Sequence, residues 1–114
     1  MEMPKPTEAD KARFREAVPL DPRVEVKPMF GNLGGFVNGN MFMGLFGADI
    51  GLKLPPADAA ALAAVEGAGP FGPAERPMGG YVSMPPAMIG TAEGRGWIDR
   101  ALGHVATLPP KKPR

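Results

Sequence analysis

The chain has 114 residues, of which 44% are hydrophobic, and its 13 basic and 12 acidic side chains leave a net charge of +1. This length is typical of one domain with one core, and so balanced a charge gives no broad attraction to nucleic acid. The absence of cysteine excludes disulfide bonds, thiolate zinc sites and cysteine nucleophiles. The chain contains no apolar run near the roughly 20 residues of a membrane span and no signal peptide at its charged start. We therefore expect a cytoplasmic protein without membrane contact.

The first predicted element is a helix that begins after Thr7 and ends near Val18, where Pro19 stops it. Threonine is a favourable N-cap residue, and acidic side chains follow it in the first turn, where the helix dipole favours them. Residues 1–6 are predicted to form a flexible arm.

The next part of the chain predicts three strands. Residues Val24 to Phe30 alternate between two faces, and Pro28 places this strand at a sheet edge or a bulge because proline cannot donate to a ladder. Asn38-Gly39 suits the type I′ turn of a hairpin, in which both central residues need positive φ. Its second strand, Asn40 to Phe46, is apolar on both faces and should therefore be covered on both. Residues Ile50 to Leu54 form the third strand.

The second half predicts two more helices around a shorter strand. Residues Ala57 to Val65 are alanine-rich and form a helix, and the following segment 67–80 is a loop rich in glycine and proline. Residues Gly80 to Met84 read as a strand, with Phe71 to Ala74 as a weak partner. The last helix begins at Thr91 or Glu93 and runs to about Ala106.

The predicted order is therefore α-β(3)-α-β(2)-α, which is typical of a single α+β domain with a mainly antiparallel sheet flanked by helices. We place this domain at residues 7–108, followed by a basic, proline-rich tail at residues 109–114.

A set of short motifs follows the same order along the chain. They are Val26-Lys27-Pro28-Met29-Phe30-Gly31, Gly35-Phe36-Val37-Asn38-Gly39-Asn40-Met41-Phe42, Leu52-Lys53-Leu54, Val82-Ser83-Met84 and the aromatic Trp97. Over roughly residues 10–106 this set resembles the N-terminal domain of the TfoX/Sxy family of competence regulators. The resemblance implies a chaperone-like α-β(3)-α-β(2)-α fold and a link to the regulation of DNA-uptake genes. The sequence departs from the family pattern at Pro28, where a basic residue is usual, and in its glycine-rich loop at residues 67–80.

The eight methionines have three interpretations: core packing, an adaptable surface for a partner, or ligands of Cu(I). No histidine or cysteine lies near Met41-x-Met43 in the sequence, which disfavours a metal. The predicted interaction surface consists of Met29, Met41, Met43, Phe46, Arg76 and Tyr81.

No catalytic set is predicted, and we expect neither an enzyme nor a bound cofactor or metal. The chain has one serine, Ser83, and one histidine, His104. The histidine falls near the end of a predicted helix, where a cation is favoured, so we expect a solvated or cap-like role. Residues Gly31 to Gly35 look like a phosphate-binding loop, but a strand follows them in place of the helix that such a loop needs.

The leading prediction is a non-enzymatic protein-interaction or regulatory module that binds a partner protein or a second copy of itself. One alternative is a weak nucleic-acid binder that uses the basic tail residues Lys111, Lys112 and Arg114. The other is a small-molecule-binding domain with a cleft near the 67–80 loop, in which Tyr81 and Arg76 supply polar contacts.

Overall fold

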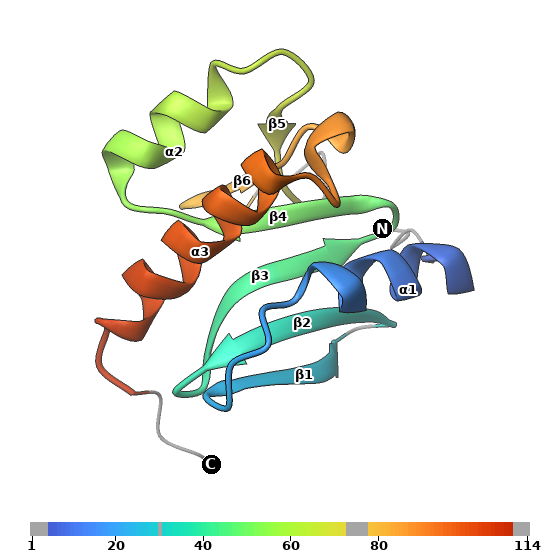
Figure 1. The fold of residues 1–114 in the computed structure, drawn as a ribbon, viewed down its shortest axis with the longest axis horizontal. Coiled ribbons are helices and arrows are strands. Elements are labelled where there is room, and N and C mark those ends of the chain that lie inside the picture. The colour runs from blue at the N-terminus through green and yellow to red at the C-terminus, as the bar shows by residue number, and fades with distance from the viewer. Residues whose placement is uncertain (1–4, 30, 73–77, 111–114) are drawn as a thin grey trace.

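A six-stranded antiparallel sheet carries three α-helices in the part of the chain that the computed structural model describes, residues 5–29, 31–72 and 78–110 (Figure 1). In chain order the elements are α1 (Glu8–Ala17), β1 (Val24–Met29), β2 (Asn32–Val37), β3 (Asn40–Phe46), β4 (Asp49–Lys53), α2 (Pro56–Ala63), β5 (Gly69–Pro70), β6 (Tyr81–Ser83), a 3-10 turn η1 (Pro86–Met88) and α3 (Ala92–Ala106). The strand order is β1-β2-β3-β4-β6-β5. The predicted α+β class and the order of helices and strands are confirmed.

The structure has one strand more than expected before α2. Asn32–Val37 is a full strand that pairs with β1 on one side and β3 on the other, although glycine at positions 34 and 35 disfavours a strand by itself. The short partner of β6 is Gly69–Pro70, which precedes the segment expected to fill that place.

The hairpin between β2 and β3 turns at Asn38 and Gly39, as predicted. Their φ angles are 54° and 80°, the positive values that a type I′ turn requires at both central positions. The prediction for Pro28 also holds, because β1 is the first strand of the sheet order and has only β2 as a neighbour.

A bulge in β3 changes the faces that its side chains occupy. Gly35 pairs with Met43 and Phe36 pairs with Met41, so Phe42 has no opposite residue in β2. The extra residue turns Phe42 and Met43 toward the same core, while Met41 lies on the other face of the sheet. Strict alternation along Asn40 to Phe46 would place Met41 and Met43 on one face, and the bulge makes this expectation wrong.

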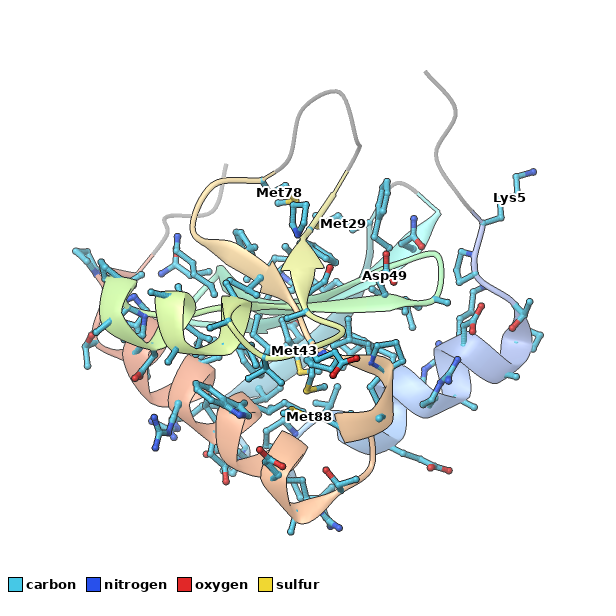
Figure 2. All side chains as sticks on the ribbon, turned by 90° about the horizontal axis from the view of Figure 1, so that it is seen from above. Lys5, Met29, Met43, Asp49, Met78 and Met88 are labelled. Atoms are coloured by element: carbon cyan, nitrogen blue, oxygen red, sulfur yellow. The ribbon has the colours of Figure 1, made fainter. Side chains whose placement is uncertain are left out.

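All three helices pack on one face of the sheet, so helices do not flank both sides (Figures 1 and 2). The core between these layers includes side chains with almost no exposure from each helix and from the sheet: Phe14 of α1, Leu62 of α2, Ile98, Ala101 and Val105 of α3, and Val37, Phe42, Met43, Ile50 and Leu52 of the sheet. Burying each large side chain contributes about 1.5–3 kcal/mol.

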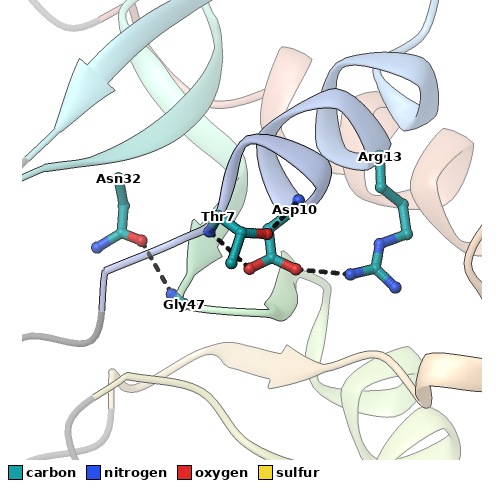
Figure 3. Close-up of polar contacts among 5 residues, drawn as sticks. All are labelled: Thr7, Asp10, Arg13, Asn32 and Gly47. Carbon is teal, nitrogen blue, oxygen red and sulfur yellow. Dashed lines mark hydrogen bonds and ion pairs between the residues drawn. The ribbon is translucent and has the colours of Figure 1, made fainter.

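Threonine caps begin both α1 and α3. The Thr7 hydroxyl accepts the Asp10 N–H at 3.0 Å, and the Asp10 carboxylate accepts the Thr7 N–H at 2.8 Å (Figure 3). The backbone N–H of Thr7 is the main cause that lowers the pKa of Asp10. Of the two predicted starts of the last helix, Thr91 and Glu93, the structure supports Thr91. Its hydroxyl accepts the Gly94 N–H at 3.0 Å and caps α3. These hydrogen bonds satisfy backbone N–H groups of the first turn, which have no partner within the helix.

The buried side chain of Asn32 connects the start of β2 to the turn between β3 and β4. Its Oδ1 accepts the Gly47 N–H at 2.9 Å (Figure 3). Of the glycine-containing segment that looks like a phosphate loop, only Gly31 lies in a turn, and residues 32–35 already belong to strand β2; no helix start follows, as expected.

Candidate functional site

Three glycines form a row across the face of the sheet that carries no helix. Gly34 of β2 pairs with Gly44 of β3, and Gly44 pairs with Gly51 of β4. Directly paired residues of antiparallel strands lie on the same face. We call these three residues the glycine row, and they leave a shallow trough across the sheet.

Larger side chains lie in this trough. A Cβ built on Gly34 would be 2.8 Å from the Phe36 ring, and one built on Gly44 would be 3.2 Å from the Met41 sulfur. A Cβ on Gly51 would overlap the ring of Phe71, the residue that follows β5. The glycine row thus lets side chains of this face cover the sheet directly, without a second layer of helices.

The ring of Phe71 is 2% exposed and lies between two other aromatic rings. Its centroid is 6.2 Å from that of Phe46, edge to face, and 6.0 Å from that of Tyr81. The Tyr81 hydroxyl donates to the backbone carbonyl of Met41 at 2.9 Å, and burial raises the pKa of this phenol. These contacts hold the start of β6 against β3.

A cleft of about 270 Å³ opens beside this cluster on the helix-free face. We call it the methionine cleft, and its lining residues are Met29, Phe36, Gly39, Asn40, Met41, Lys53, Met78 and Tyr81. Figure 2 shows Met29 and Met78 on the side of the sheet opposite the helices, whereas Met43 lies among the core side chains on the helix side. The lining comes from five strands, the hairpin turn and the loop before β6, so residues distant in the sequence meet there only in the folded chain.

The structure brings together three of the predicted surface residues, Met29, Met41 and Tyr81. Met43 has no exposed surface because the bulge turns it into the core, so its inclusion in a binding surface is wrong. Phe46 is half-buried beside Phe71 and does not line the cleft. Arg76 lies outside the described residues, as do Phe30, residues 1–4 of the predicted arm, and the tail residues Lys111, Lys112 and Arg114.

Sequence reasoning missed Phe36, Lys53 and Met78 as lining residues. Alternation along residues 50–54 does place Lys53 on the face opposite Ile50 and Leu52, which was a usable signal. No signal in the sequence points to Met78. It belongs to a loop whose path depends on Phe71, since the Met78 N–H donates to the Phe71 carbonyl at 2.8 Å.

The methionine cleft and the adjoining part of this face carry lysines. The Lys53 ammonium lies 5.7 Å from the centre of the Tyr81 ring, and the Lys27 ammonium lies 5.5 Å from that of Phe36. Lys27 also forms an ion pair of 3.7 Å with Glu25. Lys53 has no ion pair with a carboxylate among the described residues.

The segment after α3 returns to one end of the methionine cleft. The side-chain amide of Asn40, a lining residue, donates to the carbonyl of Pro109 at 3.0 Å. This hydrogen bond joins residues 69 positions apart. The chain therefore reaches the cleft at Pro109, the first residue of the predicted tail.

A second hollow of about 230 Å³ lies between α1 and α3. Its charged lining has both signs, from Arg13, Glu16 and Arg95. Leu20, which is fully exposed, lines an adjoining hollow of about 270 Å³. The hollow has no aromatic lining residue in the described part of the chain, and it offers a place for control substitutions.

The single serine and histidine lie apart from any catalytic arrangement in the described residues. The Ser83 hydroxyl donates to the Pro70 carbonyl at 3.0 Å and closes the β5–β6 pair. His104 lies in the last turn of α3, where its carbonyl accepts the Thr107 hydroxyl. Within residues 5–29, 31–72 and 78–110, no group of three histidine, cysteine or acidic residues has the arrangement of a metal site. None of the described helices has the length and apolarity needed to cross a membrane.

Fold and site together define a class of small α+β domain: one helical layer, one antiparallel sheet, and a methionine-lined cleft on the uncovered face. A family model described as the TfoX N-terminal domain matches residues 16–105, and the chain belongs to that family. The resemblance seen in the ordered motifs is thus confirmed. No curated protein and no solved structure matches the chain.

Proposed function

We propose that this protein is a non-enzymatic, regulatory protein-interaction module of the cytoplasm, and that the methionine cleft is its binding surface. The observation that carries the proposal is the make-up of the cleft: three methionines and two aromatic rings on a sheet face with no helix over it. Methionine side chains adapt to the shapes of different partners, and aromatic residues and methionine are enriched at protein interfaces.

The size of the methionine cleft favours a protein partner over a small molecule. Its volume of about 270 Å³ is just below the range of about 300–1,000 Å³ that is usual for small-molecule sites. A shallow cleft of this kind suits a few large side chains that a partner protein inserts as anchors.

The partner contacts the face of the sheet and does not extend it from β1. This edge strand carries Pro28 and the exposed, charged side chains of Glu25 and Lys27, which are features that disfavour pairing with a further strand. The partner is a different protein or a second copy of this chain, and the test below separates the two.

The test uses a pair of apolar-to-glutamate substitutions. Met29→Glu places a charge in the methionine cleft, whereas Leu20→Glu makes the same kind of change at a fully exposed site beside the other hollow. Proteins from the native host that are captured by the N-terminally tagged chain are identified by mass spectrometry, purified and titrated by calorimetry. Sedimentation equilibrium over micromolar concentrations measures self-association of the same three chains.

The proposal is supported if Met29→Glu weakens binding of a partner, or of a second copy, about tenfold or more, a loss of about 1.4 kcal/mol. Leu20→Glu should leave the same binding unchanged. Binding that survives Met29→Glu at full strength would place the interaction elsewhere and contradict the role of the cleft. Turnover of a substrate by the purified chain would contradict the non-enzymatic part.

A further inference from the structure

We propose that Met29 and Met78 are sites of reversible oxidation, at which a peroxide converts the thioether to a sulfoxide and thereby weakens binding at the methionine cleft. The modification site follows from the exposure and the position of these two side chains. Its effect on binding rests on the proposed function.

The methionines of the described residues fall into two groups by exposure. Met29 and Met78 are half-buried. The others are at most 9% exposed: Met41, Met43, Met84 and Met88. Both half-buried methionines line the methionine cleft, although β2, β3, β4 and α2 lie between them in the sequence. Because the oxidation of methionine depends on access to the sulfur, a peroxide reaches these two side chains before those of the core.

The third methionine of the cleft is packed differently. A Cβ built on Gly34 would be 3.1 Å from the sulfur of Met41, and one built on Gly44 would be 3.2 Å from it. The Met41 sulfur therefore lies directly on the glycine row, and the side chain is 9% exposed. Met41 belongs to the packed floor of the cleft, whereas Met29 and Met78 present the accessible sulfurs.

The backbone at both accessible methionines is held by the sheet. Met29 pairs with Asn32 at the end of the β1–β2 ladder. The Met78 N–H donates to the Phe71 carbonyl at 2.8 Å, and the Met78 carbonyl accepts the Tyr81 N–H at 3.4 Å. Oxidation at either residue therefore changes the chemistry of the cleft itself and not that of a remote segment.

The reaction needs a peroxide and no other reactant. A lone pair of the sulfur attacks one peroxide oxygen, and the S–O bond forms as the O–O bond breaks. With hydrogen peroxide the second oxygen leaves as water, so the sulfur loses the two electrons that the peroxide gains. Methionine sulfoxide reductases reverse the change, with two thiols forming a disulfide and the oxygen leaving as water. The chain has no cysteine, so its thioethers are its only sulfur groups.

A sulfoxide is unsuited to the binding that we propose for the cleft. Oxidation converts a flexible, apolar side chain into a polar one. An apolar anchor of the partner would cover the new oxygen and separate it from water, and burying a polar group without a hydrogen bond is unfavourable. The cleft of about 270 Å³ has room for the oxygen, so the core does not have to move and the domain stays folded.

The test treats the full chain with increasing amounts of hydrogen peroxide. Tandem mass spectrometry of its peptides gives the oxidation rate of each methionine, and circular dichroism follows the fold. The oxidised chain is then incubated with the two methionine sulfoxide reductases, one for each sulfoxide epimer, and a thiol reductant. The variants are the double change Met29→Leu with Met78→Leu, which removes both sulfurs at similar volume, and the matched control Met84→Leu in the core.

We expect Met29 and Met78 to be oxidised about tenfold or more faster than Met43 and Met84, because the two core sulfurs are reached only when the domain opens. The circular dichroism spectrum should not change at this dose, and the reductases should restore both thioethers. The same dose should weaken binding of the partner, or of a second copy, about tenfold. The double leucine variant should keep its binding after the dose, whereas Met84→Leu should lose it as the unmodified chain does.

Oxidation of Met29 and Met78 no faster than that of Met43 and Met84 would overturn the modification site, and so would sulfoxides that the reductases leave in place. The two proposals fail separately. If Met29→Glu weakens binding but the two sulfoxides do not, the effect of oxidation is overturned and the cleft remains the interaction surface. If binding is insensitive to Met29→Glu, the cleft is not the interaction surface, whereas the oxidation rates still decide the modification site.

Discussion

Replacing Gly51 with alanine tests how closely the ring of Phe71 lies on the sheet. A Cβ at this position would be 2.6 Å from Cδ2 of Phe71 and closer still to Cγ and Cδ1. These atoms lie near the root of the ring, so Phe71 cannot avoid the methyl group without leaving its place between Phe46 and Tyr81. Overpacking of this kind costs about 1–3 kcal/mol, a large part of the roughly 5–15 kcal/mol that stabilises a domain.

The assay is thermal and urea unfolding followed by circular dichroism. We expect Gly51→Ala to lower the free energy of unfolding by about 2 kcal/mol, which for a domain of this size lowers Tm by roughly 6–10 °C. Gly103→Ala is the matched control. Gly103 is exposed on α3, and a Cβ built there meets no atom within 4 Å. Alanine in a helix is favoured over glycine, so this change should stabilise by about 0.5–1 kcal/mol.

A double-mutant cycle identifies the clash as the cause. Phe71→Ala alone should cost about 3–5 kcal/mol because it leaves a cavity. Combined with Gly51→Ala, the total should be well below the sum of the two single changes, since the added methyl group then enters the vacated space. A Gly51→Ala chain as stable as the unchanged protein would refute the packing described for this face.

Three further predictions concern single polar groups. Thr91→Ala removes the cap of α3 and should lower the free energy of unfolding in urea by about 1 kcal/mol, whereas Thr91→Ser should keep most of this stability. Equal losses for both variants would mean that the hydroxyl is not the cause. Tyr81 is the one tyrosine of the chain, and burial raises its pKa above the usual 10.0, so its absorbance should titrate late. The stabilising contribution of the neutral phenol is complete below about pH 10 and is lost as the pH rises through the folded pKa; a midpoint at the unperturbed value would contradict the packing of the ring. Hydrogen bonds from Arg23 lower the pKa of Asp21 to about 2. The stability linked to this carboxyl is present above its unfolded pKa and is lost as the pH falls toward 2, and carboxyl NMR should show Arg23→Ala moving the pKa back toward 3.8.

The features that the sequence predicted well have local causes. Thr7 caps a helix through contacts three residues away, Asn38-Gly39 sets a turn by its own φ angles, and Pro28 marks an edge because it lacks an N–H. Each of these can be read from a few neighbouring residues, and the structure confirms all three.

The features that the sequence did not predict depend on pairing between distant residues. The bulge at Phe42 exists only relative to the register of β2, and that register decides that Met41 faces the cleft while Met43 enters the core. The role of the glycine row is likewise invisible in the sequence, because Gly34, Gly44 and Gly51 come together only through strand pairing, and the ring over Gly51 comes from Phe71, outside its strand. Three of the eight lining residues of the cleft, Met29, Met41 and Tyr81, were therefore predicted from residue type, whereas the arrangement of the cleft was not.

The placement of all helices on one face has a consequence for how the chain is made. The side chains of β3 and β4 that face the core receive much of their cover from Ile98, Leu102 and Val105 of α3, which follows the sheet in the sequence. At the usual rate of synthesis of about 5–20 residues per second, the interval between the end of β4 and the end of α3 is on the order of 3–10 s. Until α2 and α3 are complete, α1 is the only helix available to cover the apolar face of the four-stranded meander. Chaperone binding to the nascent chain should therefore be strongest in that interval and should end when α3 docks.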